Sequence, residues 1–111
     1  MERFLSYVTE KIAGGAWYSL EIPKIKGPYP VMVTIINGYS RNANAYIYHE
    51  LKLRTGSSLI AIKDHKSDGN IVGMHFSGHL ILMPGESIVY TASSNAAITA
   101  TLTVMGYYLN D

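Results

Sequence analysis

The sequence predicts an all-β fold, an antiparallel sandwich or jelly roll of about eight short strands. Runs rich in Val, Ile, Thr and Tyr recur every ~8–12 residues, separated by Gly, Pro, Asn and Ser, which is typical of sandwiches and barrels. The clearest run spans 98–104, where threonines alternate with Ile98, Ala100, Leu102 and Val104. This period of two indicates a strand with one buried face. A chain of 111 residues is long enough for one domain with a hydrophobic core.

The first fifteen residues are expected to form an N-terminal arm or a short helix, followed by a single β domain at 16–111. Apolar residues fall at i, i+1, i+4 and i+8, the stripe of a helix, and two glycines then stop it. These residues are Phe4, Leu5, Val8 and Ile12. An arm that becomes ordered against a neighbouring subunit fits the same residues. Both interpretations make these four candidate interface residues.

The later strands follow from β-branched and aromatic runs bounded by turn residues. A Pro- and Gly-containing loop at 23–30 separates the first two of them, and Pro84, Gly85 and Glu86 form a turn before the last two. The expected strands are 17–22, 31–36, 45–53, 58–63, 71–76, 78–83, 88–92 and 96–108. The predicted core consists of Ile98, Ala100, Leu102 and Val104 together with Ile88, Tyr90, Val33 and Ile35.

Composition argues against several classes of partner. Nine Lys and Arg against eight Asp and Glu provide no electrostatic attraction for nucleic acid or an anionic membrane. The absence of cysteine excludes disulfides and thiolate metal sites. No stretch approaches the ~20 apolar residues of a membrane span. The N-terminus lacks the pattern of a signal peptide, because Ser6 and Tyr7 interrupt its apolar part. We therefore expect a chain that stays in the compartment where it is made.

No group of residues has the pattern of a metal or catalytic site. On a continuous strand His75 and His79 would lie ~13 Å apart, too far to share a metal ion. Asp64, Asp68 and Asn70 lack the order of an EF-hand and are interrupted by lysines, which favours a solvated turn. There is neither a Gly-x-Ser-x-Gly elbow nor a cysteine nucleophile. We expect no enzymatic activity, no cofactor and no metal.

Tyrosine is unusually common, with nine tyrosines against two phenylalanines. Tyr is favoured at interfaces, where one end of its side chain is buried and the other is wet. Tyr46 and Tyr48 are predicted to share one face of a strand. An exposed pair of this kind suits carbohydrate binding or a protein interface, and packing within the domain is the simpler alternative.

The C-terminal part of the chain contains no charged side chain between Glu86 and Asp111. Solvent-facing strands normally carry Lys or Glu to discourage pairing with other chains. The row of Thr99, Thr101 and Thr103 is therefore predicted to be an assembly surface covered by a partner. An ordinary solvated face is the alternative, and the sequence does not choose between the two.

Residues 79–108 resemble the small jelly-roll virion proteins of tailed bacteriophages, which include capsid decoration ("staple") proteins and related tail modules. The resemblance rests on Leu82-x-Pro-Gly-Glu86, a strand that ends in Ala-Ser-Ser, a short polar-to-alanine turn and a final strand that ends in Gly-Tyr. Residues 16–48 are more weakly similar to the two early strands of the family. The loop at 23–30 and the helical-looking start depart from the family pattern.

The resemblance implies a virion structural protein that is made in the host cytoplasm and located in the virion. It most directly implies a capsid decoration protein that binds and stabilises the shell of the major capsid (coat) protein, self-associated as a dimer or trimer. The alternative within the resemblance is a phage tail, receptor-binding or lectin-like carbohydrate-binding module. No nucleic acid or membrane is implied as a partner.

Overall fold

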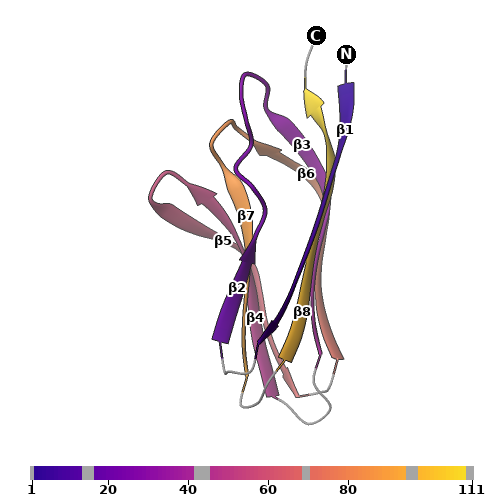
Figure 1. Cartoon of the computed structure of the whole chain (residues 1–111), viewed down its shortest axis with the longest axis vertical. Coiled ribbons are helices and arrows are strands. Elements are labelled where there is room, and N and C mark those ends of the chain that lie inside the picture. Colours follow the sequence, from indigo (N-terminus) through magenta and orange to yellow (C-terminus); the bar gives the residue numbers. More distant parts are fainter. Residues whose placement is uncertain (1, 14–16, 42–45, 69–70, 95–97, 110–111) are drawn as a thin grey trace.

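The computed structural model describes residues 2–13, 17–41, 46–68, 71–94 and 98–109. They form two four-stranded antiparallel sheets, which confirms the predicted all-β sandwich. The first sheet has the order β1-β8-β3-β6 and the second has the order β2-β7-β4-β5, and the two lie against each other in Figure 1. The strands are β1 Glu2–Ala13, β2 Trp17–Glu21, β3 Val31–Arg41, β4 Tyr46–Thr55, β5 Ser58–Asp68, β6 Ile71–Leu82, β7 Ser87–Ser94 and β8 Ile98–Leu109.

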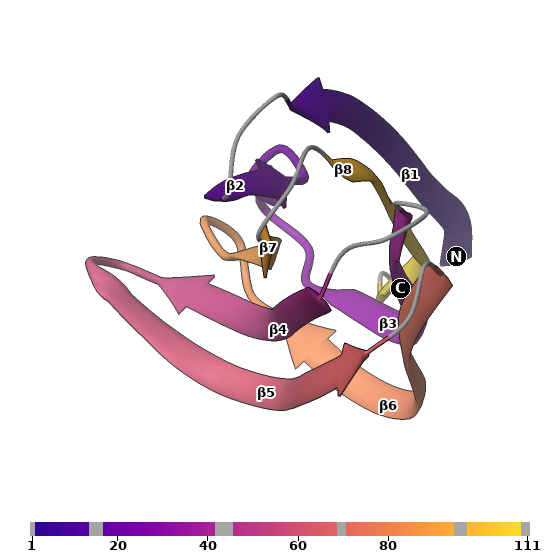
Figure 2. The same ribbon diagram turned by 90° about the horizontal axis from the view of Figure 1, so that it is seen from below.

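The pairing order is that of a jelly roll. β1 pairs with β8, β2 with β7, β3 with β6, and β4 with β5, as if one long hairpin had been folded over on itself. Additional pairing of β3 with β8 and of β4 with β7 then completes the two sheets. Viewed from below, the strands surround the common core (Figure 2).

The helix predicted near the N-terminus is wrong, because these residues form β1. β1 lies antiparallel to β8 along its whole length, from Glu2 opposite Leu109 to Ala13 opposite Ile98. The spacing of four residues between Phe4, Val8 and Ile12 is a multiple of two, so it fits a strand as well as a helix. Without β1, the backbone groups along that side of β8 would be left unpaired. The candidate arm is thus an edge strand of its own sheet.

The strands predicted at 71–76 and 78–83 are one strand, β6. Gly78, with φ +149°, lies within it rather than in a turn. The predicted total of eight strands is correct, although the strands differ. Two predicted strands are the single strand β6, and β1 is a strand that was not predicted.

The core lies between the sheets and contains the predicted alternating residues of β8. Ile98, Ala100, Leu102 and Val104 are buried, as are Ile88, Tyr90 and Val33. Ile35 is not: it is only half buried and lies on the outer side of β3. The prediction failed because a β-bulge intervenes between Val33 and Ile35.

The bulge changes which residues of β3 face inward. Val33 pairs with Gly106, but Ile35 pairs with Met105, so Thr34 is an extra residue. The extra residue shifts the alternation by one, so that Val33 before the bulge and Ile36 after it are both buried. Gly106 is required here, because a Cβ at this position would lie 2.2 Å from the carbonyl oxygen of Met32.

A polar group links the two sheets inside the core. The hydroxyl of Tyr90 in β7 is hydrogen-bonded to Ser40 Oγ of β3 and, at 2.9 Å, to His49 Nδ1 of β4. All three side chains are fully buried. Gly38 makes room for the tyrosine, since a Cβ there would lie 2.5 Å from the Tyr90 ring.

One end of the sandwich is closed by the loop at 22–30, which packs on the β6–β7 turn. The Ile25 backbone donates to the Glu86 carbonyl at 2.9 Å, and Gly85 donates to the Ile25 carbonyl at 2.7 Å. Ile22 and Ile25 are buried, whereas Tyr29 and Met83 at the same end are about half exposed. None of the described residues forms a helix long and apolar enough to span a membrane.

Candidate interaction surface

The outer side of the first sheet carries a continuous set of residues without charge, which we call the uncharged face. It includes five alternate residues of the central strand β8 and the outward residues beside them. Its members are Ser6 and Val8 of β1, Thr99, Thr101, Thr103, Met105 and Tyr107 of β8, Met32, Ile35, Asn37 and Tyr39 of β3, and His75, Ser77 and Ile81 of β6.

Strand register arranges these residues in rows across the sheet. The middle row runs from Val8 through Thr103 and Asn37 to His75. His75 Nδ1 donates to Asn37 Oδ1 at 2.5 Å, which ties β6 to β3 on the surface. The rows nearer the chain termini contain Met105, Ile35, Tyr107 and Met32 in the two central strands, so the face becomes more apolar toward that end.

Charge returns only at the opposite margin of the face. Glu10 and Arg41 occupy positions beside Thr101 and Thr99 in the strands on either side of β8. The three rows that run through Thr103, Met105 and Tyr107 contain no charged residue.

Apolar groups on this face are accessible to a partner. Val8 is 66% exposed, Ile81 49% and Tyr39 39%, whereas the threonines of β8 are half buried. Eight residue steps along β8 and three strand spacings give the face dimensions of about 26 by 14 Å, or roughly 400 Å².

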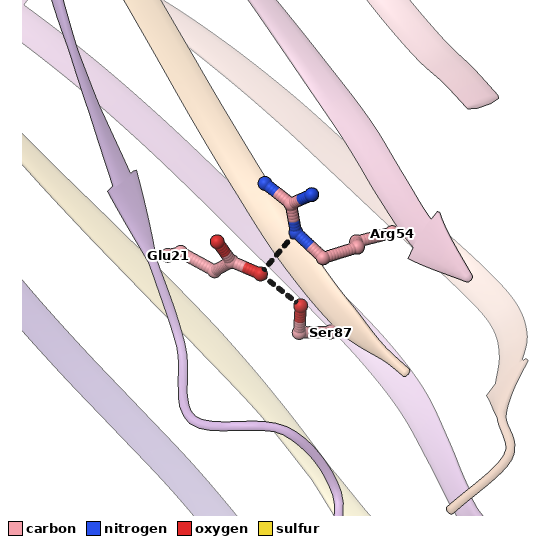
Figure 3. Close-up of polar contacts among 3 residues, drawn as sticks. All are labelled: Glu21, Arg54 and Ser87. Atoms are coloured by element: carbon pink, nitrogen blue, oxygen red, sulfur yellow. Dashed lines mark hydrogen bonds and ion pairs between the residues drawn. The ribbon is translucent and has the colours of Figure 1, made fainter. Parts of the chain in front are cut away.

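The outer side of the second sheet is different, and we call it the ion-paired face. Its central strand β7 is buried on both sides over Ser87–Ala92. Arg54 of β4 reaches across β7 to Glu21 of β2 with an Nε–Oε2 distance of 2.7 Å, and Ser87 Oγ donates to the same carboxylate (Figure 3). Farther along β4, Lys52 Nζ lies 3.3 Å from Glu50 Oε1. Neighbouring strands of the same chain thus screen β7.

The contacts with Arg54 and Ser87 favour the charged form of Glu21. Burial by itself would raise the pKa of Glu21, but the hydrogen bonds from Arg54 and Ser87, with the positive charges of Arg54 and Lys24, lower this pKa overall. On the inner side of the first sheet, burial raises the pKa of Tyr7, and the adjacent Tyr108 raises it further. The lowered pKa favours the charged form of Glu21, and the raised pKa favours the neutral form of Tyr7. Neither shift makes the side chain more reactive.

The structure brings two groups of predicted interface residues together. Val8 lies beside Thr103, Phe4 is paired with Tyr107, and Ile12 is paired with Thr99. Leu5 is paired with Gly106. The side chains of Phe4, Leu5 and Ile12 lie outside what the structure describes.

The threonine row lies on a face of the first sheet, because β8 is not an open edge. Thr99, Thr101 and Thr103 belong to a strand paired on both sides, with β1 and with β3. Their side chains can be covered from above, but their backbone cannot accept another strand.

Tyr46 and Tyr48 lie on β4, in the other sheet from the threonines. Tyr48 is half buried and paired with Ser93 on the outer side, and the side chain of Tyr46 lies outside the described part. The exposed Tyr29 and Tyr39 are on a loop and on the first sheet. These described tyrosines therefore form no single platform for a sugar.

Sequence reasoning missed the contribution of β3 and β6 to the uncharged face. Ile35 was assigned to the core, and Met32 and Asn37 were not assigned to an interaction surface. The expected strand ended at residue 36, whereas β3 continues to Arg41. The alternation of Asn37 and Tyr39 with smaller residues was the available signal.

The described residues contain no group of three or more His, Asp or Glu arranged to hold a metal ion. His75 and His79 are both exposed on β6. The side chains of Asp64 and Asp68, like Asn70 as a whole, lie outside the described part. The Ser40–Tyr90–His49 group is sealed in the core, where no substrate reaches it.

No protein-family model matches the sequence, and a search of curated proteins gives no match. Among solved structures, the chain is similar to the Yersinia pseudotuberculosis-derived mitogen, with 16% identity, a TM-score of 0.45, and coverage of 93% of this chain and 89% of that one. It is also similar to the structure of infectious bursal disease virus Gx strain, with 10% identity, a TM-score of 0.31, and coverage of 97% of this chain and 36% of that one.

Proposed function

We propose that this protein is a virion structural protein of a tailed bacteriophage, a capsid decoration protein that attaches to the coat-protein shell through its uncharged face. The observation that carries the proposal is the set of uncharged rows through Thr103, Met105 and Tyr107. These rows expose apolar and hydroxyl groups from four strands without a charge that would have to be desolvated on contact.

A partner would lie flat on the sheet rather than add a strand to it. Both neighbours of β8 are in place, so its backbone groups are already satisfied. Packing another sheet or a loop against the outer side buries the methyl groups of Thr103 and the side chains of Met105 and Tyr107. Because Tyr and Met are enriched in the cores of interfaces, this composition suits protein contact.

The size of the face indicates how firmly one copy would attach. Roughly 400 Å² is about half of the ~800 Å² that each partner contributes to a standard interface. Tyr29 and Met83, exposed at the end of the sandwich, are available to extend the contact. We therefore expect moderate affinity per copy, with stable decoration resulting from many occupied sites on a shell.

The assignment to a phage virion comes from the sequence resemblance over 79–108, and the structural role is supported by the uncharged rows of the face. Copy number separates the decoration role from the alternative of a tail or lectin-like module. Quantitative mass spectrometry of purified virions should find this chain in hundreds of copies, whereas a few copies would indicate the tail.

Attachment is tested by adding the purified protein to shells that lack it and measuring co-sedimentation. We expect saturable binding. Failure to bind, under conditions in which other virion proteins still bind those shells, would exclude the decoration role.

A further inference from the structure

We propose that acid releases the uncharged face from its partner, because two histidines on the outer side of β6, His75 and His79, become positively charged there. The inference rests on the proposed attachment through this face and adds its regulation. Histidine is the side chain whose charge ordinarily changes between about pH 5 and 8. A surface that attaches without charge in neutral solution thus gains positive charge in mild acid.

His75 lies within the middle row of the uncharged face. The strand register places it opposite Asn37 of β3, in the row that continues through Thr103 to Val8. Its Nδ1 donates to Asn37 Oδ1 at 2.5 Å, which orients the ring on the surface of the sheet. When Nδ1 is the donor, Nε2 is the nitrogen that takes up the second proton. Protonation therefore changes the charge of this row without breaking the bond to Asn37.

His79 lies on the same side of β6 as His75. Ser77 and Ile81 are both paired with outward residues of β3, so the alternation of a strand places the residue between them outward as well. His75 and His79 are both exposed. Four residue steps separate the two histidines by ~13 Å, with Ser77 between them. Acid thus charges two separate points along the β6 side of the face.

Among the described side chains, none that is charged in neutral solution lies beside these histidines on the outer side of the first sheet. β3 contributes the neutral Asn37 and Tyr39, and the position of Arg41 is two rows away from His75, at the opposite margin. β4 and β5 contact β6 from the other sheet. The titratable residues of β4 lie in the core or on the ion-paired face, and they are His49, Glu50, Lys52 and Arg54. Those of β5 have side chains outside the described part, and they are Lys63, Asp64, His65, Lys66 and Asp68.

The charge weakens attachment because it has to be desolvated. An uncharged partner surface that covers a protonated imidazole removes its water without supplying an ion pair. The bound state therefore holds fewer protons than the free state, and affinity falls as pH falls. Each histidine that has to lose its proton on attachment weakens binding by up to about tenfold per pH unit, over the range in which the free side chain is protonated.

Co-sedimentation with shells that lack the protein, at about pH 7.5 and about pH 5.5, tests this regulation. The wild type should bind about tenfold or more weakly at the lower pH. The double variant His75→Gln, His79→Gln keeps polar side chains that cannot be protonated, so its affinity should change by less than about threefold. Ser77→Gln is the matched control. It introduces a glutamine between the two histidines but leaves both able to titrate, and it should keep the wild-type pH dependence.

Circular dichroism at both pH values confirms that each protein is folded. Equal wild-type affinity at the two pH values, or stronger binding in acid, would overturn the inference and leave the proposed attachment intact. A loss of affinity in acid that persists in the double variant would also overturn it, because that loss would arise elsewhere in the protein or in the shell. Absence of wild-type binding at both pH values would contradict the proposed attachment itself, and the inference with it.

Discussion

The central strands of the two sheets, β7 and β8, both lack charged residues, but they lie beneath different outer faces. β7 is buried on both sides over Ser87–Ala92, and Arg54 of β4 reaches over it to Glu21 of β2. β8 has no such cover, and its outward residues remain half exposed along the strand. An uncharged strand can therefore be covered by its own neighbours or left available to a partner. Only the arrangement of the sheets distinguishes the two cases.

Truncating a core residue on the inner side of β8 should cause the largest loss of stability. Leu102 is fully buried, so Leu102→Ala should reduce the free energy of unfolding by ~2–5 kcal/mol. Its outward neighbour Thr103 faces away from the core, and Thr103→Ser should change stability by only ~0.5 kcal/mol or less. Urea denaturation followed by circular dichroism measures both. Similar losses for the two variants would mean that β8 is buried on both faces, as β7 is.

Removing the Tyr90 hydroxyl, which links the two sheets, should cause the next largest loss of stability. Tyr90→Phe keeps the ring but removes the hydroxyl that joins Ser40 to His49, and it leaves buried polar groups with fewer partners. The expected loss is ~1–3 kcal/mol in the free energy of unfolding. Tyr39→Phe, at an exposed tyrosine of the uncharged face, is the control and should change stability little. If both variants behave alike, the buried hydroxyl contributes nothing to holding the sheets together.

The ion-paired face should contribute least to stability. Glu21→Gln removes the charge that Arg54 contacts at 2.7 Å, but the pair is partly exposed, so the loss should be ~0.5 kcal/mol or less and should shrink at high salt.

The same variant should show a specific pH dependence. Because the folded-state pKa of Glu21 is lowered, its contribution is fully present above the ordinary Glu pKa of 4.5 and is lost as pH falls through the lower folded-state pKa. Thermal denaturation of both proteins from pH 7 downward should show the difference between them disappearing in acid. A difference that grew in acid would contradict the lowered pKa.

The fold class and most of the core could be predicted from sequence, because alternation in β8 reports burial directly. Two features could not be predicted. The apolar residues of β1 are spaced by four, which fits both helical and strand periods. The bulge at Thr34 shifts the alternation of β3 without a proline or glycine to mark it, and it moved Ile35 from the predicted core to the surface.

The candidate site was predicted only in part, for a related reason. Sequence showed that the stretch after Glu86 is uncharged, but β2, β4, β1 and β3 decide what lies beside it. These strands are far away in the chain and are brought together only by long-range pairing. Val8 and the threonine row were chosen for separate reasons, and the register places them side by side. Tyr48 was chosen for its residue type and lies in the other sheet.

The central claim is that the uncharged face, and not the ion-paired face, meets a partner. The direct test compares Thr103→Lys with Ser93→Lys in binding to shells that lack the protein. Both positions are half-buried, outward residues of a central strand, one in each sheet. The account predicts that Thr103→Lys remains folded but binds at least about tenfold more weakly, whereas Ser93→Lys binds like the wild type. Equal binding by the two variants, or a greater loss for Ser93→Lys, would contradict it.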